Sequence, residues 1–126
     1  MKLGDLEKKV MNTIWNDLGG QSFSVRDIMD LLNYTAPKQY AYNTILTVIT
    51  HLYQKDLLRR EKSGKTFTYN AKLSRELFVA KASRAVFDQM RRDYGNLAIA
   101  HFAHIVEDID PALLAEAQKE IDNAQQ

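Results

Sequence analysis

The side chains best suited to recognise another molecule lie between residues 40 and 55. Four polar residues follow one another there at steps that place them on one face of a helix: Asn43, Thr44, Thr47 and His51. A threonine can hydrogen-bond a base and place its methyl group against thymine, and an asparagine can bind adenine through two hydrogen bonds. The pattern predicts contacts with base edges in the major groove of DNA. The alternative is an ordinary polar surface that faces water.

Basic side chains gather around the same segment. Residues 38–72 hold 7 Lys or Arg and 2 Asp or Glu, in a chain whose net charge is +1. A local excess of positive charge is expected where a protein meets nucleic acid. Contacts to the DNA backbone, which add affinity without sequence information, are expected from Arg26, Lys38, Tyr42, Lys62 and Lys65. Lys55 fits either a backbone contact or an ordinary surface charge.

Three helices would position the predicted reading face. Apolar residues repeat at helical spacing over 4–18, 24–33 and 40–55. Ser24, with Asp27 three residues later, predicts the start of the second helix, and Gly19-Gly20 predicts the end of the first. The third helix would pack through one apolar face with two flanking residues: Tyr42, Ile45, Ile49 and Leu52, flanked by Leu46 and Tyr53.

A basic β-hairpin is predicted after the third helix. Residues 57–61 and 66–69 read as strands, and residues 62–65 as the turn between them, where Gly64 can adopt a positive φ. Three helices followed by a basic hairpin is the order of a winged helix-turn-helix, in which the hairpin is the wing. Residues 1–72 are therefore expected to form a winged-helix DNA-binding domain.

Residues 73–126 are predicted to be a helical dimerisation domain, which makes the fold class mainly α. Helices are expected over 74–92, over 97–109 and from Pro111 onward, with Asp110 as a cap. About 50 residues of amphipathic helix form a marginal core alone, so two copies would cover each other's apolar faces across a two-fold axis. The expected dimer contacts are Phe78, Val86, Ile99, Phe102, Val106, Leu114 and Ile121.

Composition excludes several classes of protein. The chain has no cysteine, which removes disulfide scaffolds, thiol nucleophiles and thiolate metal sites. It lacks an apolar run of the roughly 20 residues that a membrane helix needs and an apolar secretion segment at its start. A cytoplasmic protein without membrane contact is therefore expected. No glycine-rich phosphate loop and no catalytic Ser-His-Asp arrangement is evident, so we expect neither an enzyme nor a cofactor.

Two histidines in the C-terminal part allow another interpretation. His101, His104 and Asp108 would share one side of a helix, a conceivable pattern of metal ligands. A metal-responsive regulator is therefore one alternative. A surface or an interface position explains them more simply, because no second ligand cluster is present. In an interface, protonation of histidine would loosen the contact.

Several segments match one known family over nearly the whole chain. They include Gly4-Asp5-Leu6-Glu7, Ile14-Trp15, Ser24-Val25-Arg26-Asp27-Ile28, Tyr42-Asn43-Thr44-Ile45-Leu46-Thr47-Val48 and Gly64-Lys65-Thr66-Phe67-Thr68-Tyr69. The combination of a Thr-x-x-Thr helix with a Gly-basic-x-Phe-x-Tyr wing is fairly specific. In these segments the chain resembles the penicillinase-repressor family of bacterial regulators, the BlaI/MecI/CopY group. The resemblance implies a homodimeric repressor that binds an inverted-repeat operator, with the third helix in the major groove and the wing on the backbone.

The resemblance also concerns how such a repressor is released. In the lactam-sensing branch, a membrane metalloprotease sensor triggers cleavage at an Asn-Phe bond in the dimerisation region. The matching position here is His101-Phe102, which keeps the phenylalanine and lacks the asparagine. The copper-sensing branch uses paired Cys-x-Cys motifs, which a chain without cysteine does not have.

A winged-helix module that binds a protein and no DNA is a further alternative. Such modules usually lack both a basic hairpin and a third helix whose outer face has no carboxylate. Binding to random duplex DNA that weakens as salt rises would distinguish the two classes, because only DNA binding releases condensed counterions.

Overall fold

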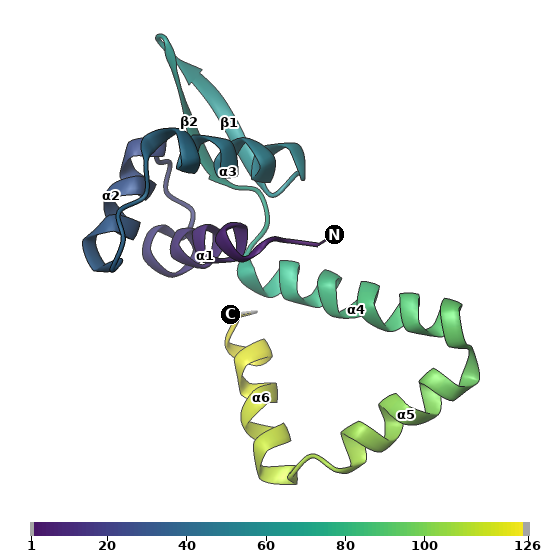
Figure 1. The fold of residues 1–126 in the computed structure, drawn as a ribbon. Coiled ribbons are helices and arrows are strands. Elements are labelled where there is room, and N and C mark those ends of the chain that lie inside the picture. Colours follow the sequence, from purple (N-terminus) through teal and green to yellow (C-terminus); the bar gives the residue numbers. More distant parts are fainter. Residues whose placement is uncertain (1, 125–126) are drawn as a thin grey trace. The chain divides into compact units, whose positions relative to one another are not determined.

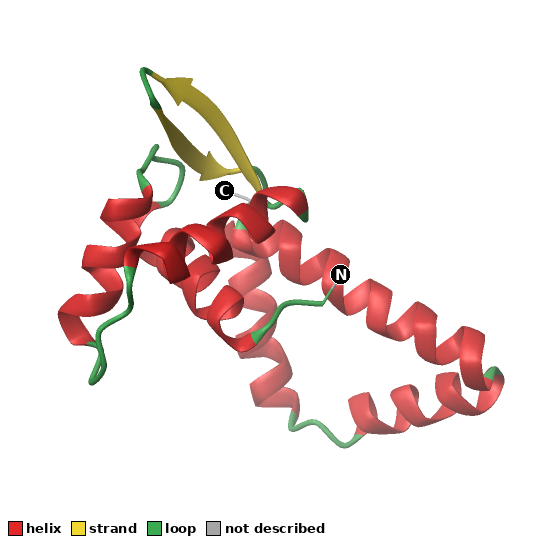
Figure 2. Ribbon diagram, turned by 45° about the horizontal axis from the view of Figure 1, so that its top comes forward, coloured by secondary structure: helices red, strands yellow, loops and turns green. Residues whose placement is uncertain are grey.

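The computed structural model of the protein describes residues 2–124 and shows two compact units, one ending at Arg75 and the other beginning at Glu76 (Figure 1). Helices make up most of both units, and the first unit contains a two-stranded antiparallel sheet (Figure 2). Three helices followed by this hairpin form a winged helix-turn-helix. The predicted mainly helical, winged fold is therefore confirmed.

The first helix ends in a wider turn than a regular α-helix. α1 covers Asp5–Thr13 and continues as a π-helical turn, η1, over Ile14–Leu18. The backbone NH of Gly19 donates to the Ile14 carbonyl at 2.9 Å, and Gly19 has a φ of 56°, which glycine adopts without steric cost. The predicted end near Leu18 is correct, but a regular α-helix up to that point is wrong. Apolar spacing does not reveal one extra residue in a turn.

The second helix, α2, covers Val25–Thr35 and begins at the predicted cap. The NH of Asp27 donates to Ser24 Oγ at 3.1 Å, and the NH of Ser24 donates to Asp27 Oδ2 at 2.9 Å. This reciprocal pair satisfies two backbone donors that would otherwise lack partners. The helix ends at Thr35, slightly beyond the predicted end near Asn33, because the residue before Pro37 is disfavoured in a helix.

The third helix, α3, covers Tyr42–Gln54 and packs through Ile45, Val48, Ile49 and Leu52, all of which are buried. Tyr42 is 44% exposed, so its predicted place in the packed face is wrong, and Val48 takes part instead. The chain leaves the helix through Asp56, whose φ is 67°, and the NH of Leu57 donates to the Leu52 carbonyl at 3.0 Å. This closure satisfies a carbonyl at the end of the helix.

The wing is a hairpin with a two-residue turn. It consists of β1, Leu58–Ser63, and β2, Thr66–Ala71. Ser63 pairs with Thr66, so only Gly64 and Lys65 form the turn, and Gly64 has the positive φ of 63° expected at its first position. Lys62 therefore lies in β1 opposite Phe67, and its predicted place in the turn is wrong.

One residue before α2 fixes the wing to the helices. Phe23 forms an isolated antiparallel bridge with Tyr69 through two backbone hydrogen bonds of 2.8 Å, and the two rings stack. Both residues are buried, in a core that includes Val10, Met11, Ile14, Ile28, Leu32, Leu57 and Leu58. The half-buried Trp15 lies at the end of β2, where its Nε1 donates to the Leu73 carbonyl at 2.9 Å. These contacts join β2 and the residues after it to Phe23 and to η1.

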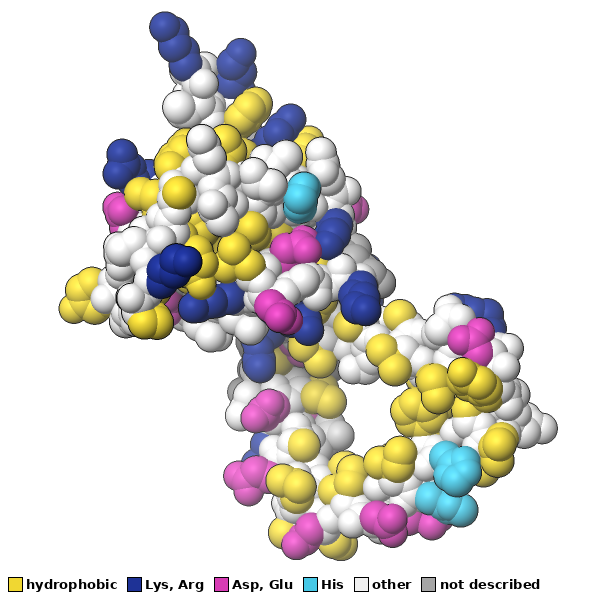
Figure 3. Space-filling view, viewed as in Figure 1, with side chains coloured by type: hydrophobic (Ala, Val, Ile, Leu, Met, Phe, Trp, Pro, Cys, Tyr) yellow, Lys and Arg dark blue, Asp and Glu magenta, His cyan; other side chains and the backbone are white. Residues whose placement is uncertain are grey.

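The second unit is formed by α4, Arg75–Tyr94, α5, Asn96–Glu107, and α6, Pro111–Ala124. Gly95, with a φ of 67°, separates α4 from α5, and Asp110 Oδ1 accepts from the NH of Ala112 at 2.8 Å as the predicted cap. Within the described part of this unit, Ala98 is the only buried hydrophobic residue. Many apolar side chains lie on the surface of these helices (Figure 3).

Candidate nucleic-acid interface

The four predicted base-reading residues lie together on the exposed side of α3: Asn43, Thr44, Thr47 and His51. All four line one shallow groove, whose opposite wall is the start of α1 at residues 4–7. The groove is open, so a large molecule can reach it. The structure therefore places these four residues on one accessible surface, which extends over about two turns of α3.

Thr47 is partly committed to its own helix. Its Oγ1 donates to the Asn43 carbonyl at 2.9 Å, and Thr50 Oγ1 similarly donates to the Leu46 carbonyl at 2.8 Å. The hydroxyl hydrogen of Thr47 is thus used, while the oxygen lone pairs and the methyl group are available. This threonine is therefore suited to accept a hydrogen bond from a base amino group or to contact the methyl of thymine.

A partly buried ion pair joins Lys55, which follows α3, to Glu7 of α1. Lys55 Nζ donates to Glu7 Oε1 and Oε2 at 2.9 and 2.8 Å and to the Lys2 carbonyl at 3.0 Å. Burial would raise the pKa of the Glu7 carboxyl, but hydrogen bonds from Lys55 and from the NH of Gly4 outweigh burial and hold that pKa below its ordinary value. The Lys55 ammonium is therefore neither a free surface charge nor available for a DNA contact, because it pairs with Glu7 of α1.

Glu7→Gln is expected to lower the free energy of unfolding by about 1 kcal/mol at neutral pH, because it leaves the Lys55 ammonium without a charged partner. The folded-state pKa of Glu7 is lowered, so this stabilisation is complete above the unfolded value of about 4.3 and is lost as pH falls through the folded value. Urea unfolding of both proteins from pH 7 to pH 2 measures it. A difference that persists at pH 2 would contradict this role.

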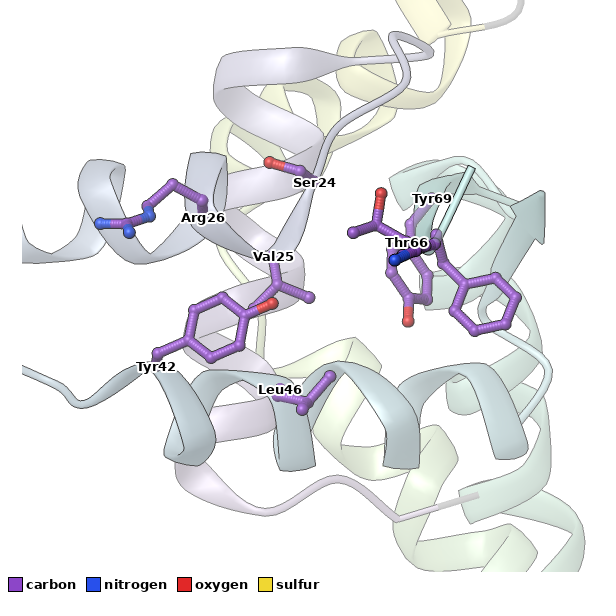
Figure 4. Close-up of a pocket in the computed structure, with 9 residues that line it drawn as sticks. Ser24, Val25, Arg26, Tyr42, Leu46, Thr66 and Tyr69 are labelled. Carbon is purple, nitrogen blue, oxygen red and sulfur yellow. The ribbon is translucent and has the colours of Figure 1, made fainter. Parts of the chain in front are cut away.

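A second groove lies between α3 and the wing (Figure 4). Three of the predicted backbone-contacting residues line it: Arg26, Tyr42 and Lys65. Figure 4 shows Tyr42 and Leu46 on one side and Thr66 and Tyr69 on the other. Residues that are distant in the sequence thus form the two walls of one groove beside the reading helix.

The groove between α3 and the wing is electrostatically suited to an anion. Arg26 and Lys65 bring positive charge from α2 and from the wing, and neither has an ion-pair partner among the described residues. Ser24, the cap of α2, also lines the groove, but its NH already donates to the Asp27 carboxylate, so the positive charge of the groove comes from Arg26 and Lys65. A backbone phosphate placed there would meet these two cations.

Two other predicted backbone contacts, Lys38 and Lys62, line neither groove. Lys38 is exposed in the loop between α2 and α3, and Lys62 is exposed on β1. The structure therefore does not bring them together with Arg26 and Lys65. Their contacts with DNA stay predictions.

An asparagine of α2 that the sequence did not point to holds the loop before α3. Asn33 Oδ1 accepts from the NH of Tyr40 at 2.7 Å, and its Nδ2 donates to the Tyr40 carbonyl at 3.1 Å. Gln39 Nε2 donates to the Asn33 carbonyl at 2.9 Å. The loop that precedes the reading helix is thus held by one side chain of α2. No local pattern in the sequence indicates this contact.

Asn33→Ala is expected to lower the free energy of unfolding by about 2 kcal/mol, because two hydrogen bonds are lost at a part-buried site. Urea unfolding measures the change. Asn12→Ala, at an exposed position of α1, is the control and should shift stability by less than about 0.5 kcal/mol. Equal stabilities of the two variants would show that the hydrogen bonds do not hold the loop.

The second unit places the remaining candidates on α5. The rings of His101 and His104 are 6.0 Å apart, and no group of three His, Cys, Asp or Glu that could hold a metal occurs among residues 2–124. The structure thus does not support the predicted alternative of a metal site that includes Asp108. Phe102 is half-buried and packs against Phe87 with ring centres 5.1 Å apart.

Of the seven expected dimer contacts, five are exposed apolar side chains in the described second unit: Val86, Ile99, Val106, Leu114 and Ile121. Phe78 and Phe102 are half-buried within one chain. The dimer itself stays a prediction.

No helix in the described part of the chain is long and apolar enough to cross a membrane.

The arrangement of three helices, a basic wing and an exposed polar face on α3 defines a winged helix-turn-helix protein. The sequence model of the family described as penicillinase repressor matches residues 3–123 of the chain. The chain therefore belongs to the penicillinase repressor family. This is a family of transcriptional repressors and not of enzymes.

Two curated relatives carry the same description or a related one. The penicillinase repressor of Staphylococcus aureus is 29% identical over 85 residues, which cover 67% of this chain and 63% of that protein. The transcriptional regulator BlaI of Mycobacterium tuberculosis is 32% identical over 79 residues, which cover 63% of this chain and 54% of that protein. The chain thus matches less than two thirds of the length of these relatives.

Solved structures of two related domains are also similar. The DNA-binding domain of the repressor BlaI has a TM-score of 0.48 and 26% identity, and covers 59% of this chain and 84% of that one. Monomeric BlaI of Bacillus licheniformis, solved in complex with the blaP half-operator, has a TM-score of 0.46 and 24% identity, and covers 60% of this chain and 87% of that one.

Proposed function

We propose that this protein is a transcriptional repressor of the cytoplasm that binds double-stranded operator DNA through its first unit. The observation that carries the proposal is the pairing of an exposed, carboxylate-free face on α3 with a groove that holds Arg26 and Lys65 beside it. Membership of a repressor family supports it. In this account the first unit, up to about residue 72, is the DNA-binding domain.

The two surfaces would have different roles. α3 would enter the major groove, which is wide enough for an α-helix, and Asn43, Thr44, Thr47 and His51 would meet base edges. The wing would lie over the backbone, where Lys65 and Arg26 would bind phosphate. Phosphate contacts position the protein, and base contacts select the sequence.

A homodimer that reads an inverted repeat is the second part of the proposal. The exposed apolar side chains of α4, α5 and α6 support it, because one chain leaves them in contact with water. A two-fold axis would present two copies of α3 to half-sites about 10 base pairs apart, one turn of DNA. Release through cleavage between His101 and Phe102 would require α5 to open, since this bond lies inside the helix.

The reading role is tested by comparing operator with random DNA. Footprinting the region upstream of the protein's own gene would locate the operator, and fluorescence anisotropy would measure affinity. Thr47→Ala is expected to weaken operator binding about 10-fold, within the range for one base contact, and to leave random-DNA binding unchanged.

A matched control is available on α1. Thr13 Oγ1 donates to the Lys9 carbonyl at 2.9 Å, as Thr47 does to the Asn43 carbonyl, so Thr13→Ala removes the same intrahelical bond away from the reading face. It should leave both affinities unchanged. Equal losses for operator and random DNA on Thr47→Ala would reject base reading, and no salt-sensitive DNA binding by the wild type would favour a protein-interaction module.

A further inference from the structure

An arginine that the sequence analysis did not select is held between two aromatic rings. The guanidinium carbon of Arg60, on β1, lies 4.1 Å from the centre of the Tyr53 ring and 4.3 Å from the centre of the Phe67 ring. Tyr53 is in the last turn of α3, and Phe67 is on β2 and lines the groove between α3 and the wing. Arg60 therefore connects the reading helix to the wing.

Contact with the two rings leaves the Arg60 side chain exposed to solvent. No carboxylate in the described part of the chain forms an ion pair with it. The N–H donors of a guanidinium lie in its plane, at the edge, in a fork that matches two oxygens of a phosphate. Stacking and phosphate binding are therefore compatible in the same side chain.

The stacking also prepares Arg60 for binding. A mobile surface arginine must lose rotamer freedom when it binds a phosphate. Arg60 has already lost much of this freedom on folding, because two rings from two different elements confine it. The cation is thus presented at a defined place beside the groove that contains Arg26 and Lys65.

We propose that Arg60 is a further DNA-binding residue, held in place by Tyr53 and Phe67 so that its guanidinium edge binds a backbone phosphate. The inference rests on the proposed function, since it adds a contact to the same DNA surface. Arg59 provides a matched control. It is an exposed arginine on the same strand, and its side chain points to the opposite face because successive residues of a strand alternate.

The experiment measures anisotropy of a fluorescent 24-base-pair duplex of random sequence at several KCl concentrations. Arg60→Gln is expected to weaken binding about 8-fold at 0.1 M salt and to reduce the slope of log K against log salt by about 0.9, the value for one phosphate contact. Tyr53→Leu keeps the charge, so it should keep the slope while weakening binding about 3-fold. Arg59→Gln should change affinity by less than about 2-fold and leave the slope unchanged.

The outcomes separate the role of Arg60 from DNA binding by the protein as a whole. Wild-type binding with an unchanged slope for Arg60→Gln, or equal effects of Arg60→Gln and Arg59→Gln, would overturn the inference and leave the proposed function intact. Absence of salt-sensitive binding by the wild type would reject the proposed function itself. If a thermal melt shows that Arg60→Gln is unfolded, Arg60→Lys decides instead. The slope should then equal that of the wild type with weaker binding, and unchanged affinity would overturn the role of the stacked guanidinium.

Discussion

Replacing Arg26 and Lys65 together by glutamine is expected to weaken binding to random duplex DNA on the order of 50-fold at 0.1 M salt. Both residues line the groove between α3 and the wing without an ion-pair partner in the described structure. Each phosphate contact that is lost removes about 0.9 from the slope of log K against log salt, so the slope should fall by about 1.8. Anisotropy over a range of salt concentrations measures both quantities.

A control with the same loss of charge separates this site from a general charge effect. Lys8 and Arg92 are exposed, and neither lines one of the two grooves. Glutamine at both positions should reduce affinity by less than about 3-fold, because neither residue belongs to the proposed DNA-contacting surface and salt screens exposed charges outside it. Similar losses in the two double variants would mean that the groove has no special part in binding.

Replacing Val106 and Leu114 together by glutamate is expected to leave the protein monomeric at micromolar concentration. These side chains are 52% and 47% exposed in the single chain. In the proposed dimer they would be buried, where an unpaired carboxylate costs several kcal/mol. Sedimentation equilibrium measures the mass, and the wild type should be a dimer under the same conditions. The monomeric variant should bind the operator more weakly than the wild type, since each half-site would then be bound separately.

Glutamate at two polar positions of the same helices is the control for this variant. Asn96 on α5 and Gln118 on α6 are exposed, and the double variant Asn96→Glu with Gln118→Glu, which adds the same two negative charges, should remain a dimer. Circular dichroism should show equal helix content in both proteins. A wild type that is monomeric at micromolar concentration would contradict the dimer, whatever the variants do.

Local signals predicted most of the fold. The cap at Ser24, the break between the helices expected over 74–92 and 97–109, and the cap at Asp110 are all confirmed, because each depends on neighbours within a few residues. Helical spacing likewise predicted the face of α3 that carries Thr47. The same reasoning could not detect the π-turn after Thr13, since one additional residue in a turn leaves the apolar stripe intact.

Contacts between distant residues were beyond prediction. Glu7 pairs with Lys55, and nothing in either segment indicates the other. Tyr42 fits the spacing of the packed face, yet it lies exposed at the groove between α3 and the wing, because spacing shows which residues share a face and not how far the packed surface extends along the helix. The place of Arg60 between two rings depends on strand register as well as on helix packing.

The most direct measurement is a titration of isotope-labelled protein with operator duplex, followed by the NMR shifts of backbone amides. If α3 and the wing bind DNA, the largest changes should occur at residues 43–51 and 62–67 and at the start of α2, residues 24–26. The described residues of α6 should change little beyond any effect of dimerisation. The largest changes at other surfaces of the first unit, such as the exposed Tyr34, or no changes at all, would contradict the account.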